Sequence, residues 1–271
     1  MNMKWSGMVL ALAAATFAGC EGGEAPGGAG TDTDTDGDSD SDSDSDSDVD
    51  SDSDTDSDSD GGTGTDDECE SVVEVTYHDF ADEHPDFGCH MYGAGITYGL
   101  VLDTLDADRK PQYNPDIPAV TGGSNPMITS AETFAQWFHS VDGVNTTSTG
   151  TLPLVEDPPG SGVYKYESTD YVVVPGQGSF TSEIHSEFVY ETGQVFTFSG
   201  DDDVWIFIDG TLAVDVGGLH TEETGSIDLD TLGLTPGETY NIDMFHAERC
   251  YPVSVFKLQT SIDCFTPVVV E

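Results

Sequence analysis

Residues Phe196 to His220 read FTFSGDDDVWIFIDGTLAVDVGGLH and contain two strand-like runs joined by a short turn. The first run, Val204 to Ile208, is entirely apolar and consists of the β-branched and aromatic residues that favour strands. Asp209-Gly210 has the composition of a two-residue hairpin turn, and it leads into a second run, Thr211–Val216. The stretch therefore predicts a β-hairpin, and the remainder of the domain is organised around it.

Short apolar runs separated by Gly, Pro and Asp predict more strands in the same domain. A fold built from many such runs is typical of a β-sandwich. We therefore predict an all-β fold, a β-sandwich with one or two short helices, preceded by a disordered linker. The additional predicted strands are Val72–Tyr77, Tyr171–Val174, Val195–Ser199, Tyr240–Phe245 and Val253–Thr260.

One helix is predicted from Ser130 to Val141. Thr129 and Glu132 have the spacing of a capping box at its start. Apolar side chains then recur at helical spacing, which indicates a face that packs on the core rather than one that binds a ligand. These side chains are Phe134, Trp137, Phe138 and Val141.

The charge of the chain limits its partners. The 271 residues include 6 basic and 53 acidic side chains, for a net charge of -47. Binding to nucleic acid depends on Lys and Arg, so this class of partner is excluded. Direct adhesion to anionic membrane surfaces is disfavoured for the same reason. The charge suits a self-repelling surface protein or one that collects divalent cations.

Residues 1–20 predict an export signal. Lys4 precedes an apolar run of about ten residues, which is too short to cross a bilayer of ~30 Å as a helix. The segment ends at Phe17-Ala18-Gly19-Cys20, which resembles the bacterial lipobox, where cleavage precedes lipidation of the cysteine. We expect a lipoprotein that contacts the membrane only through the lipid on Cys20 and is displayed at the bacterial cell surface. The alternative is an ordinary cleaved signal with an incidental Cys20.

Residues 21–67 predict a disordered linker. Aspartates occupy the even positions from Asp32 to Asp60, mostly between Ser and Thr, so the segment has almost nothing to bury. Charge repulsion extends such a chain. We expect this linker to hold the following domain, residues 68–271, away from the membrane.

Four cysteines, Cys69, Cys89, Cys250 and Cys264, lie in the domain. Behind an export signal they predict two disulfides. Because the terminal strands of a sandwich often lie side by side, we pair Cys69 with Cys264, which leaves Cys89 with Cys250. The two other pairings stay open.

Asp201, Asp202 and Asp203 stand between Gly200 and the apolar strand. Neighbouring side chains of an extended strand point to opposite faces, so two of them can hold one ion only if the backbone turns sharply there, for instance through a cis peptide. Carboxylate oxygens suit calcium, which takes six to eight oxygen ligands. The alternative is that the aspartates are solvated and Asp203 caps a turn.

A polar loop from Phe245 to Tyr251 is the best source of further ligands. It contains His246 and Glu248, and we predict that both contribute to ligand binding. Tyr251 and His220 could pack on the apolar face of a bound sugar. His220 and His246 could instead be plain loop residues, and Trp205 is predicted to lie in the core.

Seven segments of residues 72–262 resemble the fibro-slime domain, which is related to the protective-antigen insert (PA-fourteen) domain. The resemblance implies a β-rich extracellular module. In sugar-binding adhesins of the wider superfamily, two adjacent aspartates joined by a cis peptide hold a calcium ion that contacts sugar hydroxyls. The resemblance assigns that role to Asp201 and Asp202. Asp203 stands where the superfamily more often has glycine, so the pair could also be Asp202 and Asp203. The matching segments are His84–Phe87, Gln136–Phe138, Gly143–Asn145, Phe196–Gly210, Asp215–His220, Leu232–Tyr240 and Ala247–Arg249.

These observations favour a cell-surface adhesion or carbohydrate-binding module that uses calcium, with a glycan or extracellular polysaccharide as partner. A structural matrix or coat component, in which calcium only stabilises a loop, is the alternative. The chain contains no His-Glu-x-x-His, no Gly-x-Ser-x-Gly and no phosphate loop, so we do not predict an enzyme. A glycosidase that uses two carboxylates is the third alternative.

Overall fold

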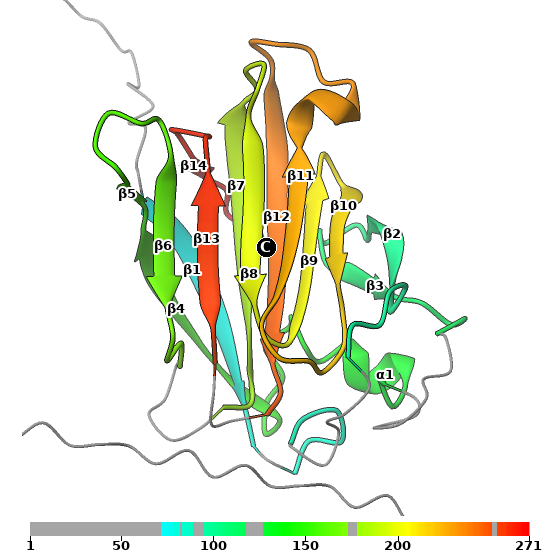
Figure 1. Cartoon of the computed structure of the whole chain (residues 1–271). Coiled ribbons are helices and arrows are strands. Elements are labelled where there is room, and N and C mark those ends of the chain that lie inside the picture. Colours follow the sequence, from blue (N-terminus) through cyan, green and yellow to red (C-terminus); the bar gives the residue numbers. More distant parts are fainter. Residues whose placement is uncertain are drawn as a thin grey trace, which may run out of the picture. The chain divides into compact units, whose positions relative to one another are not determined.

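Two antiparallel β-sheets form the domain, which confirms the all-β prediction (Figure 1). The computed structural model describes residues 72–81, 83–88, 95–117, 127–172, 178–250 and 254–270. Within these residues, a nine-stranded sheet has the order β3-β2-β10-β9-β12-β7-β1-β4, with β14 paired to β7, and a five-stranded sheet has the order β11-β8-β13-β6-β5. Their strands are β1 Val72–Phe80, β2 Val101–Leu105, β3 Pro111–Tyr113, β4 Asn145–Pro153, β5 Val155–Glu156, β6 Tyr164–Ser168, β7 Phe180–Val189, β8 Val195–Gly200, β9 Asp203–Ile208, β10 Thr211–Val216, β11 Glu223–Asp228, β12 Thr239–Glu248, β13 Phe256–Thr260 and β14 Thr266–Pro267.

The predicted hairpin is present as β9 and β10. Ile208 pairs with Thr211, and both turn residues have positive φ, 49° at Asp209 and 73° at Gly210. Positive φ at both central positions is what the favoured two-residue hairpin turn requires, and Asp and Gly accept it readily. Local sequence is therefore sufficient to place this turn.

Burial on two faces explains why β9 is apolar from Val204 to Ile208. Its even-numbered residues Val204, Ile206 and Ile208 belong to the main core between the two sheets. Trp205 and Phe207 point to the other face and belong to a second apolar cluster. Alternation along a strand places neighbouring side chains on opposite faces, so a strand buried on both sides cannot show a polar alternation.

The second cluster lies on the outer face of the nine-stranded sheet and includes Val101 of β2 and Phe134 of α1. Trp205 is fully buried there, as predicted. Phe134, Trp137 and Phe138 pack in the same cluster, so the apolar stripe predicted for the helix does serve the core, although Val141 is only partly buried.

The helix is shorter than predicted. It spans Ala131–Phe134 as α1, with Ser130 rather than Thr129 as its N-cap and Thr133 rather than Glu132 completing the capping box. After α1, the side chains of Asn145 and Thr181 hydrogen-bond to the carbonyl groups of Gln136, Trp137 and His139. Tertiary partners thus satisfy carbonyl groups that a longer helix would use internally.

Two strand predictions need correction, and strands β2 to β7, β11 and β14 were not predicted. Tyr171 and Val172 are buried or partly buried but not in a strand, and Ser254 and Val255 precede β13 rather than belonging to it. The ten-residue strand β7 was not predicted, because polar residues occupy both of its faces. A short 3-10 helix, η2 (Leu229–Leu232), completes the described elements.

Several predictions fall outside the described residues. These are the export signal, lipidation of Cys20, the linker over residues 21–67, and the roles of Cys69, Cys89 and Tyr251. Cys250 and Cys264 are each disulfide-bonded, but their pairing with Cys89 and Cys69 stays a prediction. In the part of the chain that is described, no helix has the length and apolar character to span a membrane.

Candidate functional site

The candidate site lies at one end of the sandwich, where four connections meet. Asp201 and Asp202 link the end of β8 to the start of β9. The segment after β10 supplies residues 217–220, the end of β12 supplies Glu248 and Arg249, and the approach to β13 supplies Val255. The three aspartates are therefore surrounded by segments from distant parts of the chain.

Gly200 brings the backbone of β8 close to the neighbouring chain. A Cβ atom at this position would collide with the carbonyl oxygen of Val255 and the ring of Phe198. The backbone then donates from Asp201 N to Val255 O and from Asp202 N to Ala247 O, each at 3.2 Å. The peptide bond between Asp201 and Asp202 is cis, as the resemblance implies.

Backbone N–H groups hold the carboxylates of Asp201 and Asp202. Val255 N donates to Asp201 Oδ1 at 2.5 Å. His220 N donates to Asp202 Oδ1 at 3.1 Å, and Arg249 N donates to Asp202 Oδ2 at 3.0 Å. Three separate segments thus fix the two neighbouring carboxylates through main-chain donors, whose positions depend on the fold rather than on side-chain rotamers.

Asp203 has a different partner from its two neighbours. Its Oδ2 lies 2.7 Å from Arg249 Nε, and its Oδ1 accepts from Arg249 Nη2 at 3.2 Å, in a two-point ion pair between fully buried side chains. Gly218 N donates to the same Oδ1 at 2.5 Å. Since its charge is already neutralised, Asp203 fits a positioning role better than the predicted role of metal ligand.

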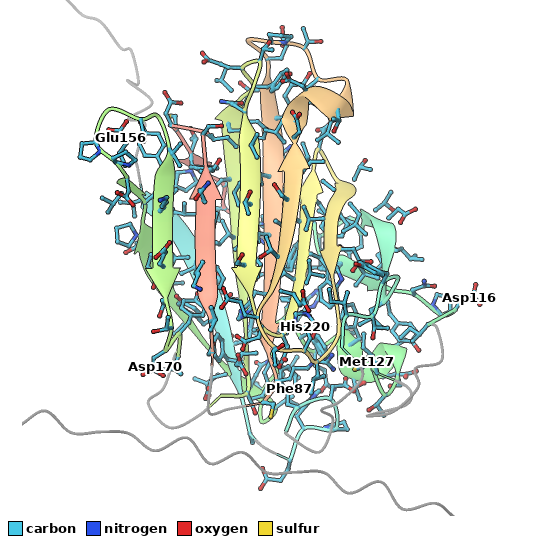
Figure 2. All side chains as sticks on the ribbon, viewed as in Figure 1. Phe87, Asp116, Met127, Glu156, Asp170 and His220 are labelled. Atoms are coloured by element: carbon cyan, nitrogen blue, oxygen red, sulfur yellow. The ribbon has the colours of Figure 1, made fainter. Side chains whose placement is uncertain are left out.

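Arg249 also joins the site to the segments that cover the outer face. Its Nη1 donates to the carbonyl oxygens of Met127 at 2.9 Å and Asp86 at 3.4 Å. The guanidinium carbon lies 4.9 Å from the ring centroid of Trp137. Figure 2 places His220, Phe87 and Met127 toward this same end of the sandwich. Sequence reasoning missed Arg249, although its membership of a matching segment and the scarcity of basic residues were available signals.

Glu248 is the third carboxylate of the site that lacks a cation. It is 1% exposed, and its Oε1 accepts from Cys250 N at 3.1 Å. Its Oε2 is buried, and within the described residues no group donates a well-formed hydrogen bond to it; the nearby Ser254 hydroxyl does not reach that geometry. Burial, followed by the charges of Asp202 and Asp201, raises the pKa of Glu248. Burial likewise raises the pKa of Asp202, although Arg249 opposes the shift.

The two histidines predicted to bind a ligand are buried. Both ring nitrogens of His246 are engaged, with Ser182 Oγ at 3.2 Å and with the Asp201 carbonyl oxygen at 2.9 Å. Burial lowers the pKa of His246 to about 4, so its ring is neutral and supports the Asp201 backbone. The ring of His220 faces carbonyl oxygens of Thr221 and Val216. Neither ring is presented to an incoming sugar, contrary to our prediction.

Oxygen donors are thus concentrated at this end, but their number is limited. Among the described residues, no group of three or more His, Cys, Asp or Glu side chains is arranged to hold a metal ion. Asp201, Asp202 and Glu248 offer hard oxygen atoms of the kind that calcium prefers. Carboxylate oxygens that accept one N–H each keep further lone pairs, so the hydrogen bonds described above do not exhaust them.

The comparisons with known proteins give relatives that extend beyond this chain. No protein-family model matches it. Protein psiR from Dictyostelium discoideum is 35% identical over 213 residues, which cover 69% of this chain and 21% of psiR. Protein psiD from the same organism is 34% identical over 210 residues, covering 71% of this chain and 41% of psiD. The chain therefore spans less than half the length of these curated relatives.

One solved structure with similar coverage is the A domain of epithelial adhesin 6 (Epa6A) from Candida glabrata in complex with Galβ1-3GlcNAc. It is 12% identical and covers 74% of this chain and 88% of that domain, with a TM-score of 0.31. A TM-score this low carries no argument about function.

Proposed function

We propose that the domain is a carbohydrate-binding or adhesion module in which Asp201 and Asp202 hold a calcium ion. The observation that carries this proposal is the pair of neighbouring carboxylates fixed by the N–H groups of Val255, His220 and Arg249. A buried oxygen of Glu248, for which the described residues provide no hydrogen-bond partner, belongs to the same end of the sandwich and supports it.

Electrostatics support a cation at this place. Arg249 makes its ion pair with Asp203, and within the described residues no ion pair is made by Asp201, Asp202 or Glu248. Buried carboxylates without a counter-ion are costly, and a divalent cation would offset that cost. When bound, calcium supplies open coordination positions that vicinal sugar hydroxyls can occupy in place of water. The aspartates orient the ion, and no catalytic step is part of the proposal.

The partner is then a glycan or an extracellular polysaccharide, and the place of action is the surface of the exporting cell. Sites of this type are weak individually, so many copies held out on the Asp-rich linker would raise the overall avidity. Anchoring through a lipid on Cys20 and extension by residues 21–67 belong to this same proposal.

A structural role is the second candidate, and one observation favours it. Asp202 is only 3% exposed, so an ion there could serve to tie the ends of β8, β10 and β12 together without touching a ligand. In that case calcium raises the unfolding temperature, and no glycan is bound.

A glycan array tests the proposal. The full chain is applied with calcium and then with chelator, alongside Asp201→Asn, which retains an oxygen to accept from Val255 N, and Asp103→Asn, an exposed control on β2 that removes one charge elsewhere. We expect chelator-sensitive binding in the wild type and in Asp103→Asn, and a loss of at least about tenfold in Asp201→Asn, as for removal of one charged ligand.

Two results count against this function. Glycan binding that is equal with calcium and chelator removes the ion from the proposal. A calcium-dependent rise in unfolding temperature with no glycan bound supports the structural role instead.

A further inference from the structure

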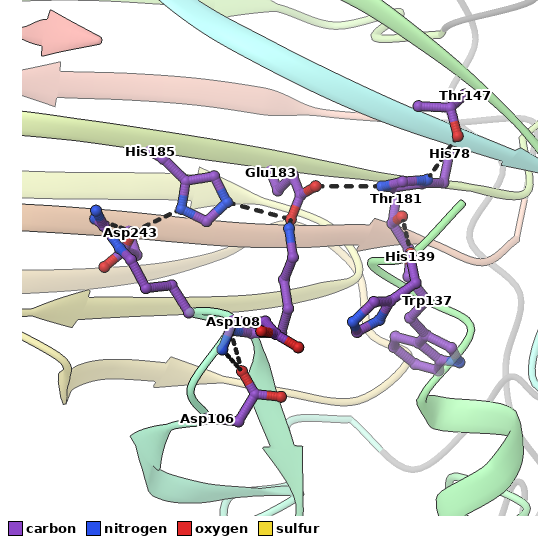
Figure 3. Close-up of polar contacts among 12 residues, drawn as sticks. His78, Asp106, Asp108, Trp137, His139, Thr147, Thr181, Glu183, His185 and Asp243 are labelled. Carbon is purple, nitrogen blue, oxygen red and sulfur yellow. Dashed lines mark hydrogen bonds and ion pairs between the residues drawn. The ribbon is translucent and has the colours of Figure 1, made fainter. Parts of the chain in front are cut away.

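A second polar cluster lies on the outer face of the nine-stranded sheet, away from the aspartates. Glu183 and His185 on β7, His78 on β1 and Asp243 on β12 contact one another through their side chains (Figure 3). The ring of His185 joins Asp243 Oδ1 at 2.6 Å to Glu183 Oε2 at 3.3 Å, and His78 Nε2 lies 3.3 Å from Glu183 Oε1. All four side chains are largely buried.

The turn between β2 and β3 adds two cations to this cluster. Arg109 Nη2 donates to Asp243 Oδ1 and Lys110 Nζ donates to Glu183 Oε2, both at 2.5 Å. The turn is shaped by Asp106, whose carboxylate accepts from the backbone of Asp108 and Lys110 (Figure 3). Two of the six basic residues in a chain of net charge -47 are thus committed to one small area.

A cavity of about 220 Å³ opens beside the cluster. Its polar lining includes Lys110, Glu183 and His185, and the apolar segment from Val268 to Val270 also lines it. Thr76 and Thr149 also line it, and they are direct cross-strand partners of β1 and β4, so their side chains are neighbours on one face of the sheet. Five different parts of the chain therefore build this one cavity.

The balance of charge at the cavity decides which ligand it suits. Lys110 is neutralised by Glu183, so the wall offers little net charge to attract a free ion. The ammonium group has three donors, and Glu183 uses one of them. Glu74 adds an acceptor at the rim. A group that both accepts from Lys110 and donates to a carboxylate matches this wall, and the hydroxyl group does both.

We propose that this cavity is a second ligand site, which takes an uncharged polyhydroxylated molecule such as one saccharide ring or a small polyol. The volume lies below the usual range for drug-sized ligands, which limits the occupant to a unit of this size. The hydroxyl groups of the ligand bond to Lys110, Thr76 and Thr149, while its C–H face packs on Val268 to Val270. The site uses no metal and shares no residue with the proposed calcium site, so it goes beyond the function proposed above.

Amide chemical shifts of the full chain test this site in the presence of chelator, which silences any calcium site. The probes are xylitol and the methyl glycosides of glucose, galactose and mannose. We expect shifts centred on Thr76, Thr149 and His185, with a Kd in the range of about 1 mM that a few hydroxyl contacts support. The same shifts should appear in Asp201→Asn.

Variants then separate the cavity from its surroundings. Thr76→Val combined with Thr149→Val preserves shape and removes both hydroxyl groups, and we expect at least about tenfold weaker binding. Lys110→Met should weaken binding similarly. The matched control is Thr151→Val, which changes an exposed residue of the same strand that does not line the cavity.

Three results would overturn the second site. The first is that no probe binds with a Kd below about 10 mM, tenfold weaker than the expected value. The second is binding that the double threonine variant leaves unchanged. The third is a set of shifts at residues 201–203 that disappears in Asp201→Asn, which would place the ligand at the first site without calcium and would also count against the role of the ion there.

Discussion

Arg249 is the residue on which the geometry of the first site depends. Its backbone N–H holds Asp202, and its guanidinium holds Asp203. The same side chain contacts the carbonyl groups of Asp86 and Met127 and the ring of Trp137. A side chain that is 0% exposed and has these four partners fixes the ends of several segments at once.

Replacing Arg249 by methionine removes a buried cation and leaves Asp203 unpaired. Breaking a buried pair in this way costs about 3–5 kcal/mol of the free energy of unfolding. Urea denaturation of wild type and variant measures the difference. Lys257→Met is the control, because Lys257 pairs with Glu222 at the surface and such pairs contribute at most about 1 kcal/mol. Equal losses in the two variants would mean that the Arg249 pair contributes no more than a surface pair.

Gly200 is the second residue whose substitution we expect to destabilise the fold. Gly200→Ala places a Cβ against a backbone oxygen of Val255, and we expect a loss of about 3 kcal/mol, the upper end for overpacking. Gly193→Ala has open space and a φ of +89°, so it should lose only about 1–2 kcal/mol from its backbone conformation. Thermal unfolding of both variants ranks them, and the reverse ranking would contradict the close approach at Gly200.

The residues of the first site could be predicted from the sequence only where the adjacent residues indicate an unusual local structure. Asp201 and Asp202 were recognisable because an acidic run next to Gly200 and an apolar strand is unusual. The roles of His246 and Arg249 were not, because both depend on contacts with residues far away in the chain, such as Ser182 and Met127. A sequence motif identifies the side chains that can bind a ligand. Contacts in the folded protein decide which of these side chains are already engaged with other protein groups.

At the scale of the elements, β7 shows why local patterns were insufficient. Its core face carries Phe180, Ile184 and Phe188, but polar residues separate them, and its outer face carries Glu183 and His185. The β2–β3 turn, which is distant in sequence, supplies the cations that pair with carboxylates on the outer face of β7 and β12. By contrast, Asp209-Gly210 determines its hairpin by itself, since the turn depends only on the two residues within it.

His185 makes the stability of this part of the sheet depend on pH. Burial alone lowers its pKa, but hydrogen bonds to Asp243 and Glu183 outweigh burial, and the pKa is raised above its ordinary value. Lys110 and Arg109 from the β2–β3 turn and His78 from β1 face the same carboxylates. A raised pKa in the folded state contributes stability below the unfolded value and loses it as pH rises through the folded value.

We therefore expect wild type to lose its advantage over His185→Gln as pH rises from about 6.5, the pKa of an unfolded histidine. Urea denaturation of both proteins between neutral and alkaline pH measures the difference, which cancels titrations common to both. Glu183 has a lowered pKa and stays ionised throughout this range, so it does not confuse the comparison. A constant difference across the range would show that His185 is not protonated in the folded protein.

For the whole molecule, the excess of acid is the dominant feature. Six basic residues oppose 53 acidic ones, and three of the six, Arg109, Lys110 and Arg249, make ion pairs with nearly buried carboxylates. The remaining surface repels itself. Raising NaCl from about 0.01 to 0.15 M shortens the screening length from ~30 to ~8 Å and should raise the unfolding temperature. A fall in that temperature would contradict the importance of repulsion.

The central claim is that Asp201 and Asp202 bind a calcium ion, and calorimetric titration of the full chain with calcium at constant ionic strength tests it most directly. Weak binding along the Asp-rich linker is common to all variants, so the difference between proteins isolates the site. We predict one stoichiometric site in wild type and in Asp103→Asn that is lost or weakened at least about tenfold in Asp201→Asn. Identical titrations for wild type and Asp201→Asn would contradict the account.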